Sequence, residues 1–429
     1  MSKSKTPNHK TTKNETIVLG LLILIFLVSR TLSLDSDIRT WEKSHYSPID
    51  EFYYTTQTLD IVEGIHAPDG KLLSAQYSAY NIVEQLVTVG TLSVFGDNHF
   101  GLTAPSVIAG MIVLILFYLL VLNRFGVAYA ASFSLLLISE QSFTLAFRIA
   151  EPTIFRMATA AAILLMLAKQ DHTQKNQLRA IGFATCFAWL FIYPTNAFLG
   201  LFTLITIATY NQKYILATSH YLTGCVLCVL AYLTNYYLLG YPFSDALTTK
   251  SIFSSRAIYE TEPSLIKQTH SKLSGINQAS IFASYPYFMT ISVLSPTLMT
   301  LLILTKDKLI ARTDKVVFIY CICFLLHCAF INDYPERKLV FLLPIFLYLC
   351  LFTANIILGK ASAKTSMILG TIAVTASVIL LATPTSNNLY KNPQYTYKNP
   401  MKELSALDDE RVIAGWATVF DCTTITNHT

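Results

Sequence analysis

The chain has 429 residues, of which 53% are hydrophobic and only 13% are charged, and its formal net charge is +5. Soluble globular domains carry about 25% charged residues, so this composition excludes an ordinary soluble fold and indicates a polytopic membrane protein. The positive charge does not indicate a nucleic-acid partner. Many of the basic residues lie in short loops between apolar runs, where they report membrane orientation.

The first apolar run, Thr16 to Ser33, follows a basic N-terminal tail. Its length is close to the roughly 20 residues that a membrane-spanning helix needs. The sequence after it, Leu34 to Asp37, lacks the small-residue pattern of a signal-peptide cleavage site. We therefore expect a retained anchor, with residues 1–15 as a cytoplasmic tail and the chain emerging on the external side.

Further apolar runs predict about eleven spans between residues 16 and 383. Basic residues cluster at the turns that this alternation places in the cytoplasm, which supports it. The predicted fold class is therefore an all-α polytopic membrane protein with an external C-terminal tail over residues 384–429. After the first run, the spans are expected to begin near Thr103, Phe125, Pro152, Ala180, Asn196, Tyr214, Ile281, Val316, Leu339 and Ser366.

Two long loops are expected on the external side, over residues 34–102 and 238–279, and the first of them is rich in acidic residues. Within it, Tyr77 to Phe95 is amphipathic and only moderately apolar. This pattern is typical of helices that lie at the membrane interface instead of crossing it. We therefore expect the first external loop to be structured and to contain amphipathic interfacial helices.

Two adjacent carboxylates in this loop are the strongest candidates for chemistry. Asp50 and Glu51 have aromatic neighbours, among them Tyr46, Phe52 and Tyr54. An acid held among apolar groups is partly desolvated, which makes its ionised form a stronger base. Acids are also tolerated in any polar external loop, but the aromatic surroundings favour a catalytic role here.

A second acidic candidate, Glu151, lies where the third apolar run ends and the fourth begins. Pro152 suits the first position of a new helix, and the acid before it could serve only to complement the dipole of that helix. However, two alternating spans return Glu151 to the same side of the membrane as Asp50. The two acids can therefore face one cavity.

Three basic residues at short external turns, Arg148, Arg337 and Lys338, stand against the usual charge trend of membrane proteins. One interpretation is that they are snorkelling anchors of lipid-facing helices. The other is a clamp for an anionic lipid phosphate, because arginine presents a fork of donors that fits phosphate.

The sequence lacks the usual motifs of several common enzyme classes. No HExxH, Walker loop, GxSxG or dinucleotide-binding glycine pattern stands out, which argues against hydrolase, ATPase and oxidoreductase activities. Cys225 and Cys228 lie within an apolar run and are interpreted as packing residues, as is His327. No metal-ligand residues are predicted.

The order of several short motifs resembles the integral-membrane glycosyltransferases of the GT-C fold. It resembles in particular the group that includes the protein O-mannosyltransferases and the aminoarabinose and lipopolysaccharide-core sugar transferases. The resemblance covers most of residues 16–360. It rests on Pro48-x-Asp50-Glu51-x-x-Tyr54, on Phe95-Gly96 with Leu102 to Gly110, on Arg148-x-x-Glu151-Pro152, and on Glu336-Arg337-Lys338 with Leu342-Leu343-Pro344.

This resemblance implies a GT-C transmembrane domain that transfers a sugar, with inversion, from a polyprenyl phosphate to an acceptor hydroxyl on a glycan, lipid or protein. It implies that Asp50 is the general base. Glu51 and Glu151 would position the acceptor or an optional divalent metal ion, and Tyr54 would contact substrate. The reaction would take place on the external face of a bacterial or archaeal cell membrane.

The chain also departs from the family pattern. The Lys-Pro-Pro-Leu stretch that often precedes the amphipathic helix is replaced by Ser74-Ala75-Gln76-Tyr77, which leaves Lys71 as the candidate substitute for a phosphate-binding lysine. The predicted external tail is short, whereas some members carry a large C-terminal domain.

Two other functions remain open on the sequence. A transporter or flippase for a lipid-linked or anionic solute would also be polytopic, although such proteins commonly show related halves and broken helices. A glycan polymerase or ligase would use a lipid-diphosphate donor instead of a monophosphate.

Overall fold

The computed structural model describes residues 13–32, 36–37, 75–96, 99–148, 154–169, 174–192, 194–211, 213–238, 300, 310–330, 335–358, 363–386 and 395–396. In this part of the chain the structure is helical, apart from two short strands. The strands β1 (Ser36–Asp37) and β2 (Tyr395–Thr396) are antiparallel, with Ser36 opposite Thr396. They join the segment after the first helix to the segment after the last one.

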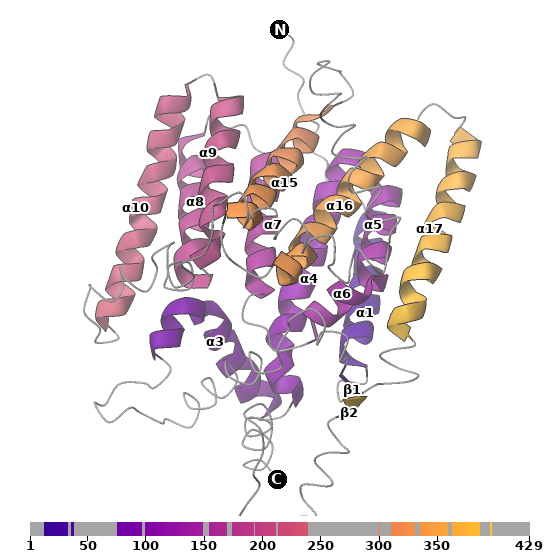
Figure 1. Cartoon of the computed structure of the whole chain (residues 1–429), viewed down its shortest axis with the longest axis horizontal. Coiled ribbons are helices and arrows are strands. Elements are labelled where there is room, and N and C mark those ends of the chain that lie inside the picture. The colour runs from indigo at the N-terminus through magenta and orange to yellow at the C-terminus, as the bar shows by residue number, and fades with distance from the viewer. Residues whose placement is uncertain are drawn as a thin grey trace, which may run out of the picture.

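The helices follow the order expected from the sequence (Figure 1). They are α1 (Lys13–Thr31), α3 (Ala75–Phe95), α4 (His99–Phe125), α5 (Val127–Ser139), α6 (Gln141–Ala146), α7 (Ile154–Lys169), α8 (Lys175–Phe187), the π-helical turn η2 (Ala188–Ile192), the 3-10 turn η3 (Pro194–Ala197), α9 (Phe198–Tyr210), α10 (Tyr214–Leu238), α15 (Arg312–Phe330), α16 (Pro335–Leu358) and α17 (Ala363–Ser386).

A helix covers every predicted span start except Pro152 and Ile281, which lie outside the described residues, and α7 begins two residues after Pro152. Within the described residues, three helices are long and apolar enough to cross a membrane: Lys13–Thr31, Phe100–Phe125 and Tyr214–Asn235. These features identify an integral membrane protein, whereas the full number of spans stays a prediction. The last helix runs to Ser386, slightly past the predicted start of the tail, a difference within the usual scatter of helix ends.

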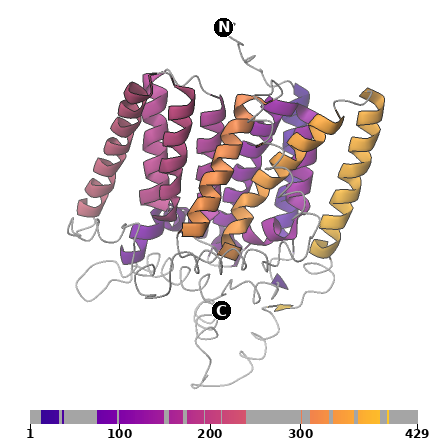
Figure 2. The same cartoon turned by 45° about the horizontal axis from the view of Figure 1, so that its top comes forward.

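The long helices run side by side, and α3 lies across one end of them (Figures 1 and 2). We call this end, where α4 begins and α1 ends, the α3 end. The opposite end, where α4 finishes at Arg124 and Phe125, is called the Arg124 end. Helix α4 packs against α1, α3, α5 and α7, so it forms the centre of the bundle.

A sharp corner joins α3 to α4. Gly96 has a φ of +83°, a conformation that favours glycine, and its amide donates to the carbonyl of Leu92 at 2.8 Å. The hydroxyl of Thr91 donates to the carbonyl of Gly101 at 2.7 Å, and a Cβ on Gly101 would collide with the carbonyl oxygen of Gly96. The motif Phe95-Gly96 therefore marks a helix end and a tight return of the chain.

Helix α3 exposes several large apolar side chains and buries several polar ones. Gln85, Thr88 and Thr91 are buried together with Leu92, whereas Leu86 and Val94 are 66% and 74% exposed. In a soluble protein the apolar side would face the core. The predicted amphipathic segment is therefore confirmed as a helix, and part of its apolar surface is exposed.

Candidate functional site at the α3 end

Most of the predicted site residues belong to segments outside the described part of the chain. Asp50, Glu51, Tyr54, Lys71 and Glu151 lie outside the described residues. Arg337 and Lys338 belong to the first turn of α16, but only their backbone is described. Of the predicted site residues, Arg148 is therefore the one whose side chain the structure describes. The candidate site is identified from the contacts of Arg148 and its neighbours.

Arg148 follows α6 and its side chain is buried. Its Nη1 donates hydrogen bonds to two backbone carbonyls at the end of α1, that of Leu32 at 2.7 Å and that of Ser29 at 3.3 Å. The last carbonyls of a helix have no partner within the helix, and a cation complements the negative end of its dipole. Arg148 thus caps α1 at the point where the chain enters the first long loop.

A second arginine, Arg30, lies in the last turn of α1 and is fully buried. Its Nη1 donates to the carbonyl of Ile138 in α5 at 3.2 Å and to the hydroxyl of Ser29 at 2.7 Å. The guanidinium carbon lies 4.7 Å from the ring centre of Phe26 and 5.6 Å from that of Phe143, distances typical of cation–π contacts. Arg30 therefore links the ends of α1 and α5.

Glu140 lies between α5 and α6 and is 1% exposed. Its Oε2 accepts the backbone N–H of Phe143 at 2.6 Å, so the carboxylate caps the start of α6. Gly110 of α4 packs directly against the rings of Phe26 and Phe147, because a Cβ there would lie 2.7 Å from Phe26 and 2.6 Å from Phe147. The ends of α1, α5 and α6 are thus packed closely against α4.

A third buried arginine, Arg156, lies in the first turns of α7. Its Nε donates to Oδ1 of Asn196 at 3.5 Å, and Nδ2 of Asn196 donates to the carbonyl of Ala188 at 2.8 Å. Ala188 begins the π-helical turn η2, and π-turns occur often at functional sites. The α3 end therefore contains a second polar cluster, formed by α7, η2 and η3.

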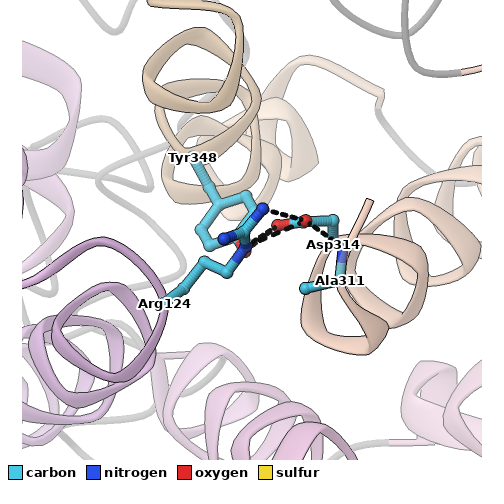
Figure 3. A network of polar contacts seen from close by, with 4 residues as sticks. All are labelled: Arg124, Ala311, Asp314 and Tyr348. Carbon is cyan, nitrogen blue, oxygen red and sulfur yellow. Dashed lines mark hydrogen bonds and ion pairs between the residues drawn. The ribbon is translucent and has the colours of Figure 1, made fainter. Parts of the chain in front are cut away.

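The opposite end of the bundle has a different kind of polar network (Figure 3). Asp314 is fully buried, and its carboxylate accepts two bonds from Nε of Arg124, at 2.9 and 3.0 Å, and one from the hydroxyl of Tyr348 at 2.7 Å. Nη2 of Arg124 lies 2.8 Å from Oδ2, and the amide of Ala311 donates to the same oxygen at 2.8 Å. This network joins α4, α15 and α16.

Sequence reasoning overlooked Arg30, Glu140, Arg156 and Asp314 as structural or functional residues. Their signal was available, since a charged residue inside an otherwise apolar helix is expensive and is usually functional or paired. Arg124 was interpreted only as a marker of orientation. Its pairing with Asp314 joins segments far apart in the sequence, and no local pattern indicates such a contact.

Two residues that were interpreted as packing residues have surroundings that fit this interpretation. His327 is buried, and its ring centre lies 5.1 Å from that of Phe198. Cys228 is buried and free, in a small cluster with Cys186 and Tyr232. Within the described residues there is no group of three or more His, Cys, Asp or Glu side chains that could hold a metal ion. The optional divalent ion therefore stays a prediction.

The structure was compared with known proteins. Neither a protein-family profile nor a curated sequence matches the chain. Among solved structures, ArnT from Cupriavidus metallidurans bound to undecaprenyl phosphate is similar with a TM-score of 0.56 and 14% identity, covering 89% of this chain and 67% of that chain. The apo state of the same protein gives a TM-score of 0.55 and 13% identity, with 87% of this chain and 64% of that chain covered.

The Archaeoglobus fulgidus oligosaccharyltransferase, in complex with Zn and sulfate, is similar with a TM-score of 0.51 and 12% identity. The likeness covers 91% of this chain and 56% of that chain, so this chain spans little more than half of the larger protein. Both proteins are membrane glycosyltransferases of the GT-C fold. At these identities the comparison establishes the fold, and the fold of this chain is GT-C.

Proposed function

We propose that the protein is an inverting membrane glycosyltransferase that uses a sugar linked to a polyprenyl phosphate. The observation that carries this proposal is the shared fold with ArnT, which was solved bound to undecaprenyl phosphate. The motif order in the sequence supports the same function independently, because it places an Asp-Glu pair in the segment after the first helix.

In this proposal the α3 end is the external end of about eleven membrane spans. The exposed apolar side of α3 lies in the membrane interface, where Leu86 and Val94 contact lipid. The acids at Asp50, Glu51 and Glu151 then belong to segments that begin or end at the α3 end. A donor held in the outer leaflet can reach them without leaving the membrane.

Asp50 acts as the general base. Its carboxylate takes the proton of the acceptor hydroxyl while that oxygen attacks the anomeric carbon of the donor sugar from the face opposite the lipid phosphate. The bond between the anomeric carbon and the phosphate oxygen breaks, and the lipid phosphate leaves with the electron pair. The configuration at the anomeric carbon is therefore inverted, with Glu51 and Glu151 orienting the acceptor and Tyr54 in contact with substrate.

The leaving phosphate carries a negative charge that must be stabilised. We assign this role to Arg337 and Lys338 in the first turn of α16, with Lys71 as a further candidate. Arg148 takes a different role, because its Nη1 is already engaged by two carbonyls of α1. Arg30, Arg148 and Arg156 bring buried guanidinium groups to the α3 end, and a low dielectric strengthens the attraction between such groups and an anionic lipid.

Replacing Asp50 by Asn tests the function directly. We expect the release of undecaprenyl phosphate from synthetic undecaprenyl-phosphate sugars, assayed in membranes containing the natural acceptor, to fall by about 10²–10⁴-fold. Insertion and thermal stability should not change, because Asn is nearly isosteric. An Asp50→Asn protein with full activity refutes the proposed base.

The natural donor sugar and acceptor are best identified by mass analysis of cell-surface glycans with and without the protein. A sugar that is absent from the glycans without the protein identifies the donor sugar, and the molecule that lacks it identifies the acceptor. Transport of intact lipid-linked sugar, without release of lipid phosphate, would instead support a flippase. Activity with undecaprenyl-diphosphate donors alone would support a polymerase or ligase.

A further inference from the structure

We infer that Arg30 and Arg148 are positioning residues, which hold the start of the first external loop in the place where its Asp-Glu pair can work. This inference rests on the proposed function. It gives Arg148 a role other than the phosphate binding expected from sequence, and it assigns a role to Arg30.

The contacts of the two arginines converge on one short stretch of chain. Arg148 donates to the carbonyls of Ser29 and Leu32, and Arg30 donates to the hydroxyl of Ser29. Since Arg30 also donates to the carbonyl of Ile138, the end of α1 is tied both to the end of α5 and to the segment after α6. The direction in which the chain leaves α1 is therefore set by three elements.

Stability alone is a poor explanation for this arrangement. The side chains are 0% and 4% exposed, so both charges have lost most of their contact with solvent. Buried charges are weak contributors to stability, because well-packed apolar residues often serve as well. A guanidinium does offer directed bonds to several oxygens at once, which fixes geometry in a way that apolar packing does not.

The other boundaries of the same loop are also held. Ser36 and Asp37 of β1 pair with β2 shortly after the end of α1. At the far side of the loop, α3 is fixed to α4 by the bond from Thr91 to Gly101 and by the turn at Gly96. The first external loop thus leaves α1 at an anchored point of the α3 end, and its last part, the helix α3, is fixed to α4 there.

The test compares Arg148→Gln with Arg124→Gln, a variant that removes a partly buried guanidinium from the opposite end of the bundle. Three quantities are measured on the full-length protein in membranes or nanodiscs. They are the thermal midpoint, the hydrogen exchange of residues 33–74, and kcat and KM for release of undecaprenyl phosphate from its synthetic sugar esters.

For Arg148→Gln we expect amide exchange in residues 33–74 to become about tenfold faster or more. The kcat should fall by about 10²-fold, the usual cost of displacing a reacting group by about 1 Å, and KM for the lipid donor should change little. Arg148→Lys should recover part of the kcat. Arg124→Gln should lower the thermal midpoint at least as much, with exchange in residues 33–74 and kcat unchanged.

Unchanged exchange of residues 33–74 in Arg148→Gln overturns the inference, and so does faster exchange with an unchanged kcat. If Arg148→Gln does not fold, Arg148→Lys and Arg30→Lys are judged by the same two criteria. The result of this test can be distinguished from the result of the Asp50→Asn test of the proposed function. An active Asp50→Asn protein refutes the base whatever the exchange shows, and an inactive one leaves the positioning role to be decided by exchange and kcat.

Discussion

The described contacts of the arginines differ between the two ends of the bundle. At the Arg124 end, the guanidinium of Arg124 meets the carboxylate of Asp314, and Tyr348 and the amide of Ala311 complete the network. At the α3 end, the described contacts of Arg30 and Arg148 are to backbone carbonyls, a hydroxyl and aromatic rings.

This difference separates two uses of the same side chain. An arginine that bonds a carboxylate joins helices through an ion pair, whereas arginines that bond carbonyls order the backbone at helix ends. In the proposed function, the α3 end binds the anionic lipid, and the Arg124 end holds helices together. The predictions below test this contrast, in order of decreasing effect.

Removing the acid of the Arg124 network should have the largest effect on stability. Asp314→Ala deletes the partner of Arg124 and of Tyr348 and leaves a guanidinium in a mostly buried place, which costs about 3–5 kcal/mol. Unfolding can be followed by labelling of the buried thiols Cys321 and Cys323 of α15 with a thiol-reactive fluorophore.

The control for this measurement is Asp314→Asn, which keeps the shape and part of the hydrogen bonding and should unfold at an intermediate temperature. The kcat of the surviving folded protein should stay within about twofold of the original, since the network lies at the end opposite the proposed site. A large fall in kcat without loss of stability would contradict the division between the two ends.

Neutralising a cation of the α3 end should weaken anion binding. Arg156→Gln removes a buried charge near Asn196 but leaves an amide that can still hydrogen-bond. We expect the affinity for undecaprenyl phosphate in nanodiscs to fall by about tenfold, equivalent to about 1.4 kcal/mol. Arg124→Gln is the matched control and should bind the lipid as before. Equal losses in the two variants would show that the charge of Arg156 has no specific role in binding.

The smallest predicted effect concerns a single hydroxyl. Tyr348→Phe removes the 2.7 Å bond to Asp314 but keeps the ring and the ion pair with Arg124. The expected loss is about 1 kcal/mol of unfolding free energy, measured by the same thiol labelling. No change would mean that the ion pair alone holds α4 against α15, and a loss as large as that of Asp314→Ala would mean that the hydroxyl is essential to the network.

Much of the architecture could be predicted because a membrane span is encoded by one continuous run of apolar residues. Apolar runs of suitable length anticipated α1, α4 and α10, and the amphipathic stretch from Tyr77 anticipated α3. Gly96 was part of a recognised motif, and its positive φ explains why glycine stands there. The motif order also anticipated the GT-C fold, which the solved structures of ArnT and the oligosaccharyltransferase confirm.

The candidate site was less predictable, because its described contacts join distant parts of the chain. Arg148 was chosen from sequence as a phosphate ligand, and its described partners are the carbonyls of Ser29 and Leu32. The roles of Asp50, Glu51, Glu151, Arg337 and Lys338 stay predictions that the proposed variants can test. The π-turn at Ala188 and the short helix α6 had no recognisable local signal.

By itself the sequence determined a helical membrane protein, the order of its helices and the amphipathic segment that forms α3, because apolar length and period act through neighbouring residues. Tertiary structure alone decided which partners the described arginines contact. Arg124 bonds the carboxylate of Asp314 because α15 begins beside the end of α4. Arg30 and Arg148 bond backbone carbonyls because the ends of α1 and α5 lie beside the segment after α6. The described partner of each arginine therefore depends on which helix ends meet, and that is a property of packing.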